Sequence, residues 1–237
     1  EKLTPELAQI GTHLRLPLAD FARIHTALAG GGVKLVDATP LIRRLRLIKS
    51  TAEIEKIAYV CQIVSDAFAA LPSSTALGSR ERDIFRAFKM DILRRGADDV
   101  PYLVGGAGQD GYTNIISPPS DQMMQRGDIL MLDTGSTFDG YFCDFDRNFA
   151  FGRASDIARR AYDLLYQATE AGLKAARAGV TAVSLYRSMR AVLEAGGMAS
   201  QTVGRLGHGL GMQLTEWPSL RPTDQTVLQP GMVITLE

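Results

Sequence analysis

Apolar and polar positions along this chain follow two alternating patterns. Apolar residues spaced three or four apart predict helices over residues 18–28, 51–71, 79–95, 155–177 and 181–195, with a short basic helix from Pro40 through Leu47. Shorter apolar runs predict strands near residues 33–36, 102–107, 112–116, 128–137 and 141–151. The order is helix, helix, strands, and then the same again, which indicates an α+β fold.

Several element ends are marked by local sequence. Ser50 and Glu53 have the spacing of a capping box, so a long helix is expected to begin there and to end at Pro72. Ser155 is expected to cap another helix. Asp139-Gly140 lies between two apolar runs and has the composition of a tight hairpin turn.

The chain contains an internal repeat of a short sequence pattern. Residues 126–133 and 230–237 each place a turn glycine before an apolar run, and each run closes on a carboxylate, Asp133 or Glu237. These two carboxylates are 104 positions apart, and the same offset brings Ser155 to position 51, beside Ser50. We therefore expect two α+β halves related by a pseudo-twofold axis, with strands in one mixed, mainly antiparallel sheet and helices outside.

Four residues are candidate metal ligands. Asp133 and Asp144 flank the predicted hairpin turn, and an antiparallel pair can bring such residues face to face. They could also be exposed hairpin acids, but the apolar residues around them favour burial, where a lone carboxylate is costly. His208 lies between glycines that let backbone approach closely, although a single histidine is often only structural. With Glu237, this set suits Mn, Co, Fe or Zn.

One further acid and the overall composition complete the picture. Asp146, two positions after Asp144, is either a supporting acid beside the ligands or a strand-end charge paired with an arginine. Lys plus Arg equals Asp plus Glu, 26 each, which gives no argument for nucleic acid or a membrane as partner. Cys61 and Cys143 form no CxxC motif, which favours two packed thiols in a reducing, cytoplasmic compartment.

These residues resemble the pita-bread metallopeptidase family, which includes methionine aminopeptidase, aminopeptidase P, prolidase and creatinase. The resemblance is carried by Asp133-Thr134-Gly135, Gly140-Tyr141 with Asp144 and Arg147, His208-Gly209-Leu210-Gly211, Glu216 with Pro218, and Leu236-Glu237. Residues 45–50 before the long helix are similar to the Xaa-Pro peptidase branch.

The resemblance implies a fold, a cofactor and roles for residues. Residues 48–237 would form a pita-bread catalytic domain truncated at its carboxyl end, and residues 1–47 would be the remnant of a creatinase-type amino-terminal domain and its linker. Asp133 would bind one of two divalent ions, Asp144 would bridge both, and His208 and Glu237 would bind the second. A further bridging glutamate would lie beyond the end of this sequence. Glu216 would be catalytic.

The sequence departs from the family pattern at three positions. Ile116 and Thr215 stand where the peptidases usually have histidines that bind substrate, and Asp146 stands where they usually have threonine. Thr215 and Asp146 would then contact the ligating side chains rather than the metal, and would help to orient them. The leading expectation is a metal-dependent hydrolase that cleaves a peptide bond next to proline in a small peptide. The alternatives are C–N hydrolysis or lyase chemistry on another small molecule, and a catalytically silent binding protein. Similar proteins are commonly homodimers.

Overall fold

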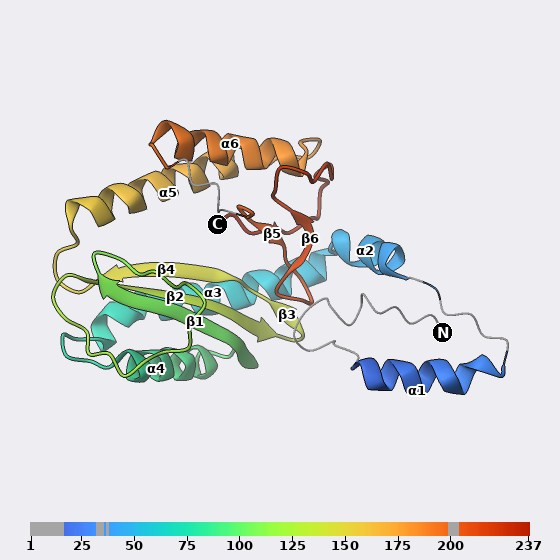
Figure 1. The fold of residues 1–237 in the computed structure, drawn as a ribbon, viewed down its shortest axis with the longest axis horizontal. Helices are drawn as coiled ribbons and strands as arrows, with labels where there is room; N and C mark the ends of the chain where they lie inside the picture. Colours follow the sequence, from blue (N-terminus) through green and yellow to red (C-terminus); the bar gives the residue numbers. More distant parts are fainter. Residues whose placement is uncertain (1–16, 32–35, 37, 199–203) are drawn as a thin grey trace.

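The computed structural model describes residues 17–31, 36, 38–198 and 204–237. The helices follow one another as the sequence pattern predicts, and the α+β class is confirmed (Figure 1). The elements are α1 (Leu18–Ala29), α2 (Thr39–Leu47), α3 (Thr51–Ser74), α4 (Glu81–Arg94), β1 (Asp99–Gln109), β2 (Asp128–Phe138), β3 (Tyr141–Phe142), β4 (Phe145–Ala150), α5 (Asp156–Ala175), α6 (Ala182–Ala195), β5 (His208–Gly209) and β6 (Glu216–Ser219).

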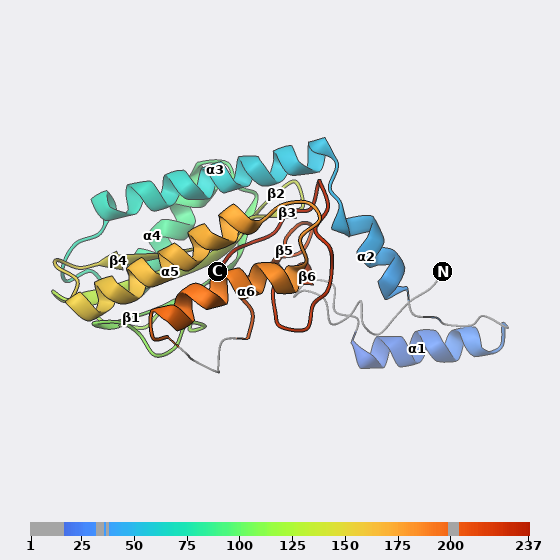
Figure 2. The ribbon, with the colours of Figure 1, turned by 90° about the horizontal axis from the view of Figure 1, so that it is seen from above.

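The first half is built on a four-stranded antiparallel sheet. Strand β2 is central, pairing with β1 on one side and with β3 and β4 on the other. Leu130 and Leu132 of β2 are fully buried in a core shared with α3 and α4, which lie on one face of the sheet. Helices α5 and α6 lie on the other side (Figures 1 and 2). Side chains alternate across a strand, so residues 131, 133 and 135 face away from that core.

Helix α3 begins where its sequence predicts and runs further than expected. Ser50 Oγ accepts a hydrogen bond from the Glu53 amide, and the Glu53 carboxylate accepts one from the Ser50 amide at 2.7 Å, which confirms the capping box. The prediction that Pro72 ends the helix is wrong, because the helix continues to Ser74. A proline in the last turn removes only one backbone donor, and the hydroxyls of Ser74 and Thr75 satisfy the Leu71 carbonyl, each at 3.0 Å.

Two strand predictions in the first half need correction. No strand forms over residues 112–116, and the next residue, Ser117, makes only an isolated bridge with Gly105 of β1. The loop instead packs directly against β1, since a Cβ on Gly106 would lie 2.5 Å from the Asn114 carbonyl. The single strand expected over residues 141–151 is interrupted at Cys143 and Asp144. The strand predicted near residues 33–36 lies largely outside the described residues.

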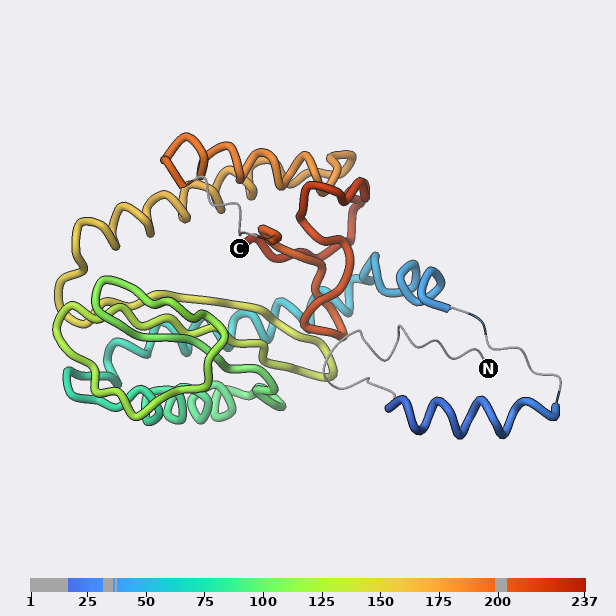
Figure 3. Tube along the Cα trace, in the orientation of Figure 1, coloured from blue at the N-terminus to red at the C-terminus, as the bar shows by residue number. Residues whose placement is uncertain are grey.

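The second half is less regular than the first. Helices α5 and α6 pack together over a core of their own, but β5 and β6 form a separate antiparallel sheet of two short strands. Among the described residues the strands therefore lie in two sheets rather than one. The strand expected at 230–237 forms only an isolated bridge, Gly209 with Ile234, although its backbone hydrogen-bonds with residues 206–210. This last segment runs between α6 and the first sheet (Figure 3).

A small third core joins the two halves. Ile57 of α3, Phe142 of β3 and Leu210 after β5 are buried together, and Leu214 and Val233 pack against them. Helix α1 has no buried residues and lies at one end of the molecule (Figure 2). Within the described part of the chain, no helix is long and apolar enough to cross a membrane.

Candidate metal centre

The hairpin of the first sheet presents Asp133 and Asp144 toward the second half. The turn predicted at Asp139-Gly140 is present, with both residues at positive φ, 46° and 81°. Asp133 lies on the β2 face that points away from α3 and α4, and its cross-strand partner in β4 is Asp146. On the same face, a Cβ at Gly135 would contact the Leu214 side chain, so this surface faces the second half.

His208 and Glu237 come from two extended segments of the second half that lie side by side. The Thr235 amide donates to the His208 carbonyl at 2.7 Å, and the Glu237 amide donates to the Leu206 carbonyl at 3.3 Å. Flanking glycines make this possible, because a Cβ on Gly207 would lie 2.2 Å from the Thr235 carbonyl and one on Gly209 2.0 Å from the Trp217 carbonyl. The prediction that these glycines allow close backbone approach is therefore confirmed.

Three of the four candidate ligands converge. His208 Nε2 lies 3.1 Å from Asp144 Oδ2 and 2.9 Å from Glu237 Oε1. Ligand atoms of these three residues all lie within 4.8 Å of one another. Asp133 is outside this tight group, but it is close enough for the charges of Asp144 and Glu237 to act on it. The three residues thus form the centre of the site, and Asp133 lies at its edge.

The electrostatics of the site reflect crowded negative charge. Burial and the neighbouring charges of Asp144 and Asp146 raise the pKa of Asp133 to about 7. Burial also raises the pKa of Asp144, although its hydrogen bond with His208 opposes this. Burial alone would lower the pKa of His208, but its hydrogen bonds to Asp144 and Glu237 outweigh that effect and raise it to about 9. A site that stabilises added positive charge in this way favours a cation.

The donor set fits a divalent metal ion. Carboxylate oxygens with one imidazole nitrogen suit hard and borderline ions such as Mn, Co, Fe or Zn. His208 Nδ1 lies 2.8 Å from the Gly209 carbonyl, which leaves Nε2 directed at the carboxylates, as in many histidine ligands. A cation bound between the acids would take the place of a proton on Nε2, so metal binding there would be coupled to proton release.

The other predicted site residues lie at different distances from this centre. Asp146, the cross-strand neighbour of Asp133, faces the same side of the sheet, and desolvation together with the charge of Glu237 raises its pKa. Glu216 is not part of the cluster, because its buried carboxylate pairs with Lys49 at 3.0 Å. Thr215 Oγ1 accepts a hydrogen bond from Arg205 at 3.3 Å. Ile116 is 65% exposed, in the loop that precedes β2.

Three residues that matter here were not singled out from the sequence. The Tyr102 hydroxyl donates to Asp133 Oδ2 at 3.2 Å, which orients that carboxylate. The positive charge of Arg205 acts on both Asp144 and Glu237. Lys49 holds Glu216. No local pattern marks Tyr102 or Arg205, whereas Lys49 lies in the segment whose resemblance to the Xaa-Pro branch was noted.

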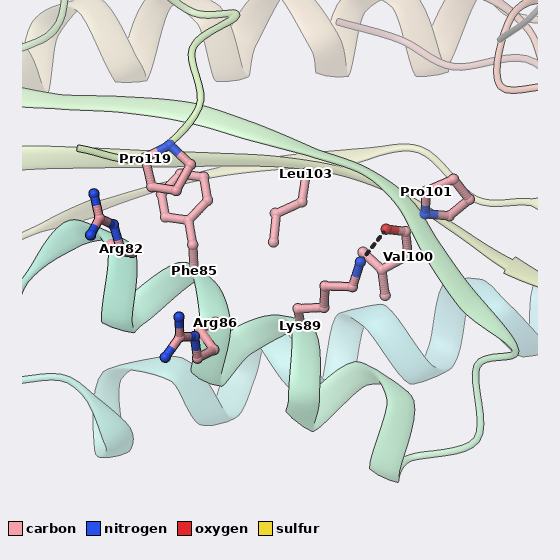
Figure 4. A pocket seen from close by; sticks show the side chains of 8 residues that line it. All are labelled: Arg82, Phe85, Arg86, Lys89, Val100, Pro101, Leu103 and Pro119. Carbon is pink, nitrogen blue, oxygen red and sulfur yellow. Dashed lines mark hydrogen bonds between the residues drawn. The ribbon is translucent and has the colours of Figure 1, made fainter. Parts of the chain in front are cut away.

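A hollow of about 400 Å³ lies elsewhere, between α4 and β1. Arg82, Arg86 and Lys89 lie at its edge, and Lys89 Nζ donates to the Val100 carbonyl at 3.1 Å (Figure 4). Its strand residue Leu103 packs against the core of the first half, on the opposite face of the sheet from Asp133. This hollow is therefore separate from the carboxylate site.

A helix-flanked antiparallel hairpin and a second half that together enclose an acidic, histidine-containing centre define a pita-bread metallopeptidase domain. Comparison with known families agrees: the model of metallopeptidase family M24 matches residues 55–237, and the chain belongs to this family.

Several named relatives are similar to this chain. An Xaa-Pro dipeptidase of Pyrococcus furiosus is 31% identical over 207 residues, covering 83% of this chain and 57% of the relative. The probable dipeptidase PepE of Mycobacterium tuberculosis is 32% identical over 223 residues, covering 94% of this chain and 57% of the relative. The chain thus spans little more than half the length of these relatives.

Solved structures share the same fold. A prolidase from Thermococcus sibiricus superposes with a TM-score of 0.86 at 26% identity, covering 93% of this chain and 60% of that one. This agreement confirms the pita-bread fold expected from the sequence resemblance.

Proposed function

We propose that the protein containing this chain is a metal-dependent peptidase that cleaves the bond before proline in Xaa-Pro dipeptides. The observation that carries the proposal is the convergence of Asp144, His208 and Glu237 within 4.8 Å at the junction of the two halves. Membership of family M24 and the similarity to Xaa-Pro dipeptidases support the same activity.

Asp133, Asp144, His208 and Glu237 would hold divalent ions, and we propose two of them, with Mn among the candidates. Bound here, the metal would supply a nucleophile by lowering the pKa of a water molecule, and it would polarise the scissile carbonyl. The chain's own residues orient the donors: Tyr102 holds Asp133, the Gly209 carbonyl holds the His208 ring, and Thr235 Oγ1 donates to Glu237 Oε1 at 2.9 Å. Thr235 and Tyr102 therefore keep the carboxylates in place.

Arg205 is suited to recognise the substrate. Its guanidinium reaches Thr215, in the position where similar peptidases usually have a histidine, and its charge acts on the centre. A dipeptide ending in proline presents a carboxylate next to the scissile bond, and a guanidinium pairs well with that group. We propose that Arg205 binds this carboxylate in place of a histidine.

The wider setting of the protein follows from the same reasoning. Residues 48–237 would be the catalytic domain, and residues 1–47 would belong to a preceding domain and linker. Cys61 and Cys143 are free thiols, which supports a reducing, cytoplasmic location. The protein would act on small peptides as a homodimer.

The decisive experiment uses the full-length protein, stripped of metal with a chelator and then reloaded with Mn. Release of free proline from Leu-Pro is expected only after reloading, with little release from the tripeptide Leu-Pro-Gly, and the His208→Ala variant should release none. Failure of the reloaded, folded protein to release proline from any Xaa-Pro dipeptide would overturn the proposed activity.

A further inference from the structure

The linker between α2 and α3 contains a buried ion pair. Lys49 Nζ lies 3.0 Å from Glu216 Oε2, and the two side chains are only 2% and 3% exposed. A buried charge is costly unless its partner is held in good geometry, so this pair constrains the position of both residues. Lys49 precedes residues 55–237, the part matched by the family model.

Lys49 contacts both segments that carry ligands from the second half. Its side chain holds Glu216 in β6, which pairs with β5 and so with His208. Its backbone amide donates to the Gly231 carbonyl at 2.8 Å, at the start of the segment that ends in Glu237. One residue of the linker therefore contacts both β6 and the irregular segment that ends in Glu237.

The Glu216 carboxylate transmits this constraint to the loop after His208. Its Oε1 accepts a hydrogen bond from the Gln213 amide at 3.2 Å. Its Oε2 occupies the space that a side chain on Gly211 would need, 2.6 Å from the expected Cβ. The Gly211 carbonyl in turn accepts a hydrogen bond from the Phe142 amide at 2.8 Å, which connects the loop to the strand just before Asp144.

The first turn of α3 is hydrogen-bonded to the strand that leads to Asp144. The Glu53 carboxylate accepts a hydrogen bond from the Tyr141 hydroxyl at 2.9 Å, three positions before Asp144. Lys49 and the first turn of α3 together therefore contact all three segments that supply the converging ligands, although neither lies in the metal centre itself.

We propose that Lys49 is a positioning residue of the metal centre, which acts through Glu216 to hold the His208 loop and through Gly231 to hold the Glu237 segment. In this proposal Glu216 is the structural partner of Lys49 in the ion pair and takes no part in the chemical step. The effect on metal binding rests on the proposed function, whereas the effect on the His208 loop does not.

The test compares full-length unmodified protein with Lys49→Met and with the control Lys56→Met. Lys56 lies in α3, the helix that follows Lys49, and also pairs with a carboxylate, Asp139, but that pair is largely exposed. Two properties are measured at a temperature where circular dichroism shows each variant to be folded. One is amide hydrogen exchange of residues 206–219 in the metal-free protein, and the other is the dissociation constant for Mn.

Lys49→Met is expected to speed exchange in residues 206–219 at least tenfold and to weaken Mn binding at least tenfold, while Lys56→Met changes neither beyond twofold. Lys49→Arg, which keeps the charge, should recover part of both losses. Lower thermal stability of Lys49→Met with unchanged exchange and unchanged Mn affinity would show that Lys49 is merely structural and would overturn the proposal.

A variant that does not fold leaves the proposal testable. The double variant Lys49→Met/Glu216→Gln removes both buried charges together and so avoids an unpaired ion. It should still show faster exchange in the His208 loop, and normal exchange there would overturn the proposal. If unmodified protein binds no metal, the proposed function fails, and the exchange measurement still decides the role of Lys49.

Discussion

The two halves of this domain supply their metal ligands in different ways. In the first half, Asp133 and Asp144 project from a hairpin whose central strand spans Asp128–Phe138. In the second half, His208 and Glu237 project from segments with a two-residue strand and an isolated bridge. The first pair is held by a regular ladder, whereas the second depends on glycine contacts, the third core and the Lys49–Glu216 ion pair. A repeated sequence pattern therefore does not imply that both copies are stabilised in the same way.

The largest expected effect is the loss of activity on replacing a metal ligand, and it should be equally large for a ligand from either half. Asp144→Asn and His208→Ala should each lower kcat/KM for Leu-Pro by about 10³-fold or more, because each removes a donor from the shared centre. Steady-state kinetics on the Mn-loaded full-length protein, with circular dichroism as a control for folding, measures this. A decrease in kcat/KM of less than tenfold in either variant would show that the replaced residue is not a ligand of the metal centre.

Glycine replacements should separate the halves. Gly209→Ala forces a Cβ to within 2.0 Å of a backbone carbonyl, whereas Gly135→Ala meets only the end of the Leu214 side chain, at 2.5 Å. We expect a loss of about 3 kcal/mol in the free energy of unfolding for the first and about 1 kcal/mol for the second, because a side chain can move aside and a strand cannot. Urea unfolding checks this, and equal losses would mean that the second half is as adaptable as the first.

Removing a charge at the edge of the centre should stabilise the metal-free protein. Burial and Asp144 raise the pKa of Asp133 to about 7, so its carboxylate is ionised at pH 8 at a cost to the folded state. Asp133→Asn should then increase the free energy of unfolding by about 1 kcal/mol at pH 8 in chelator. The gain should shrink as the pH falls through 7, where Asp133 becomes protonated in the folded state, and it should vanish only below the ordinary pKa of an aspartate, where the unfolded chain is protonated as well. Destabilisation at pH 8 would show that the acids do not repel one another.

The smallest effect concerns the capping box that starts α3. Ser50→Ala should lower the free energy of unfolding at pH 7 by about 0.5 kcal/mol, with the regular first sheet otherwise intact. The Ser50 amide is the main cause that lowers the pKa of Glu53, and the variant keeps it. The Ser50 hydroxyl also donates to the Glu53 carboxylate at 2.8 Å and lowers that pKa further, so this part of the stabilisation is present above the ordinary pKa of a glutamate and is lost as the pH falls through the lowered value. Urea unfolding from pH 7 to pH 3 should show the difference between the variant and the unmodified protein becoming smaller, and a constant difference would contradict a role for the hydroxyl bond to Glu53.

Local sequence was enough for elements whose ends are set by neighbouring residues. Ser50 with Glu53 marked the start of α3, and Asp139-Gly140 marked the hairpin, because capping and positive φ are properties of adjacent residues. The same hairpin made Asp133 and Asp144 visible as a pair. The repeat of the 126–133 pattern at residues 230–237 also pointed to Glu237, which lies beside His208 in the structure.

Only the tertiary structure decided how the second half is built. Lys49 and Glu216 are 167 positions apart, and nothing near either residue indicates that a buried lysine will find that glutamate. Tyr102 lies on β1 and hydrogen-bonds to Asp133 on the neighbouring strand β2, 31 positions away in the sequence. This contact depends on how the two strands are paired, which the sequence of neither strand reveals. The apolar run at 230–237 has the composition of a strand, yet it forms no regular ladder, because its neighbours are a glycine loop and a short strand. Periodicity reports what a segment can form alone, while pairing between distant segments depends on which groups the folded chain brings within hydrogen-bond distance.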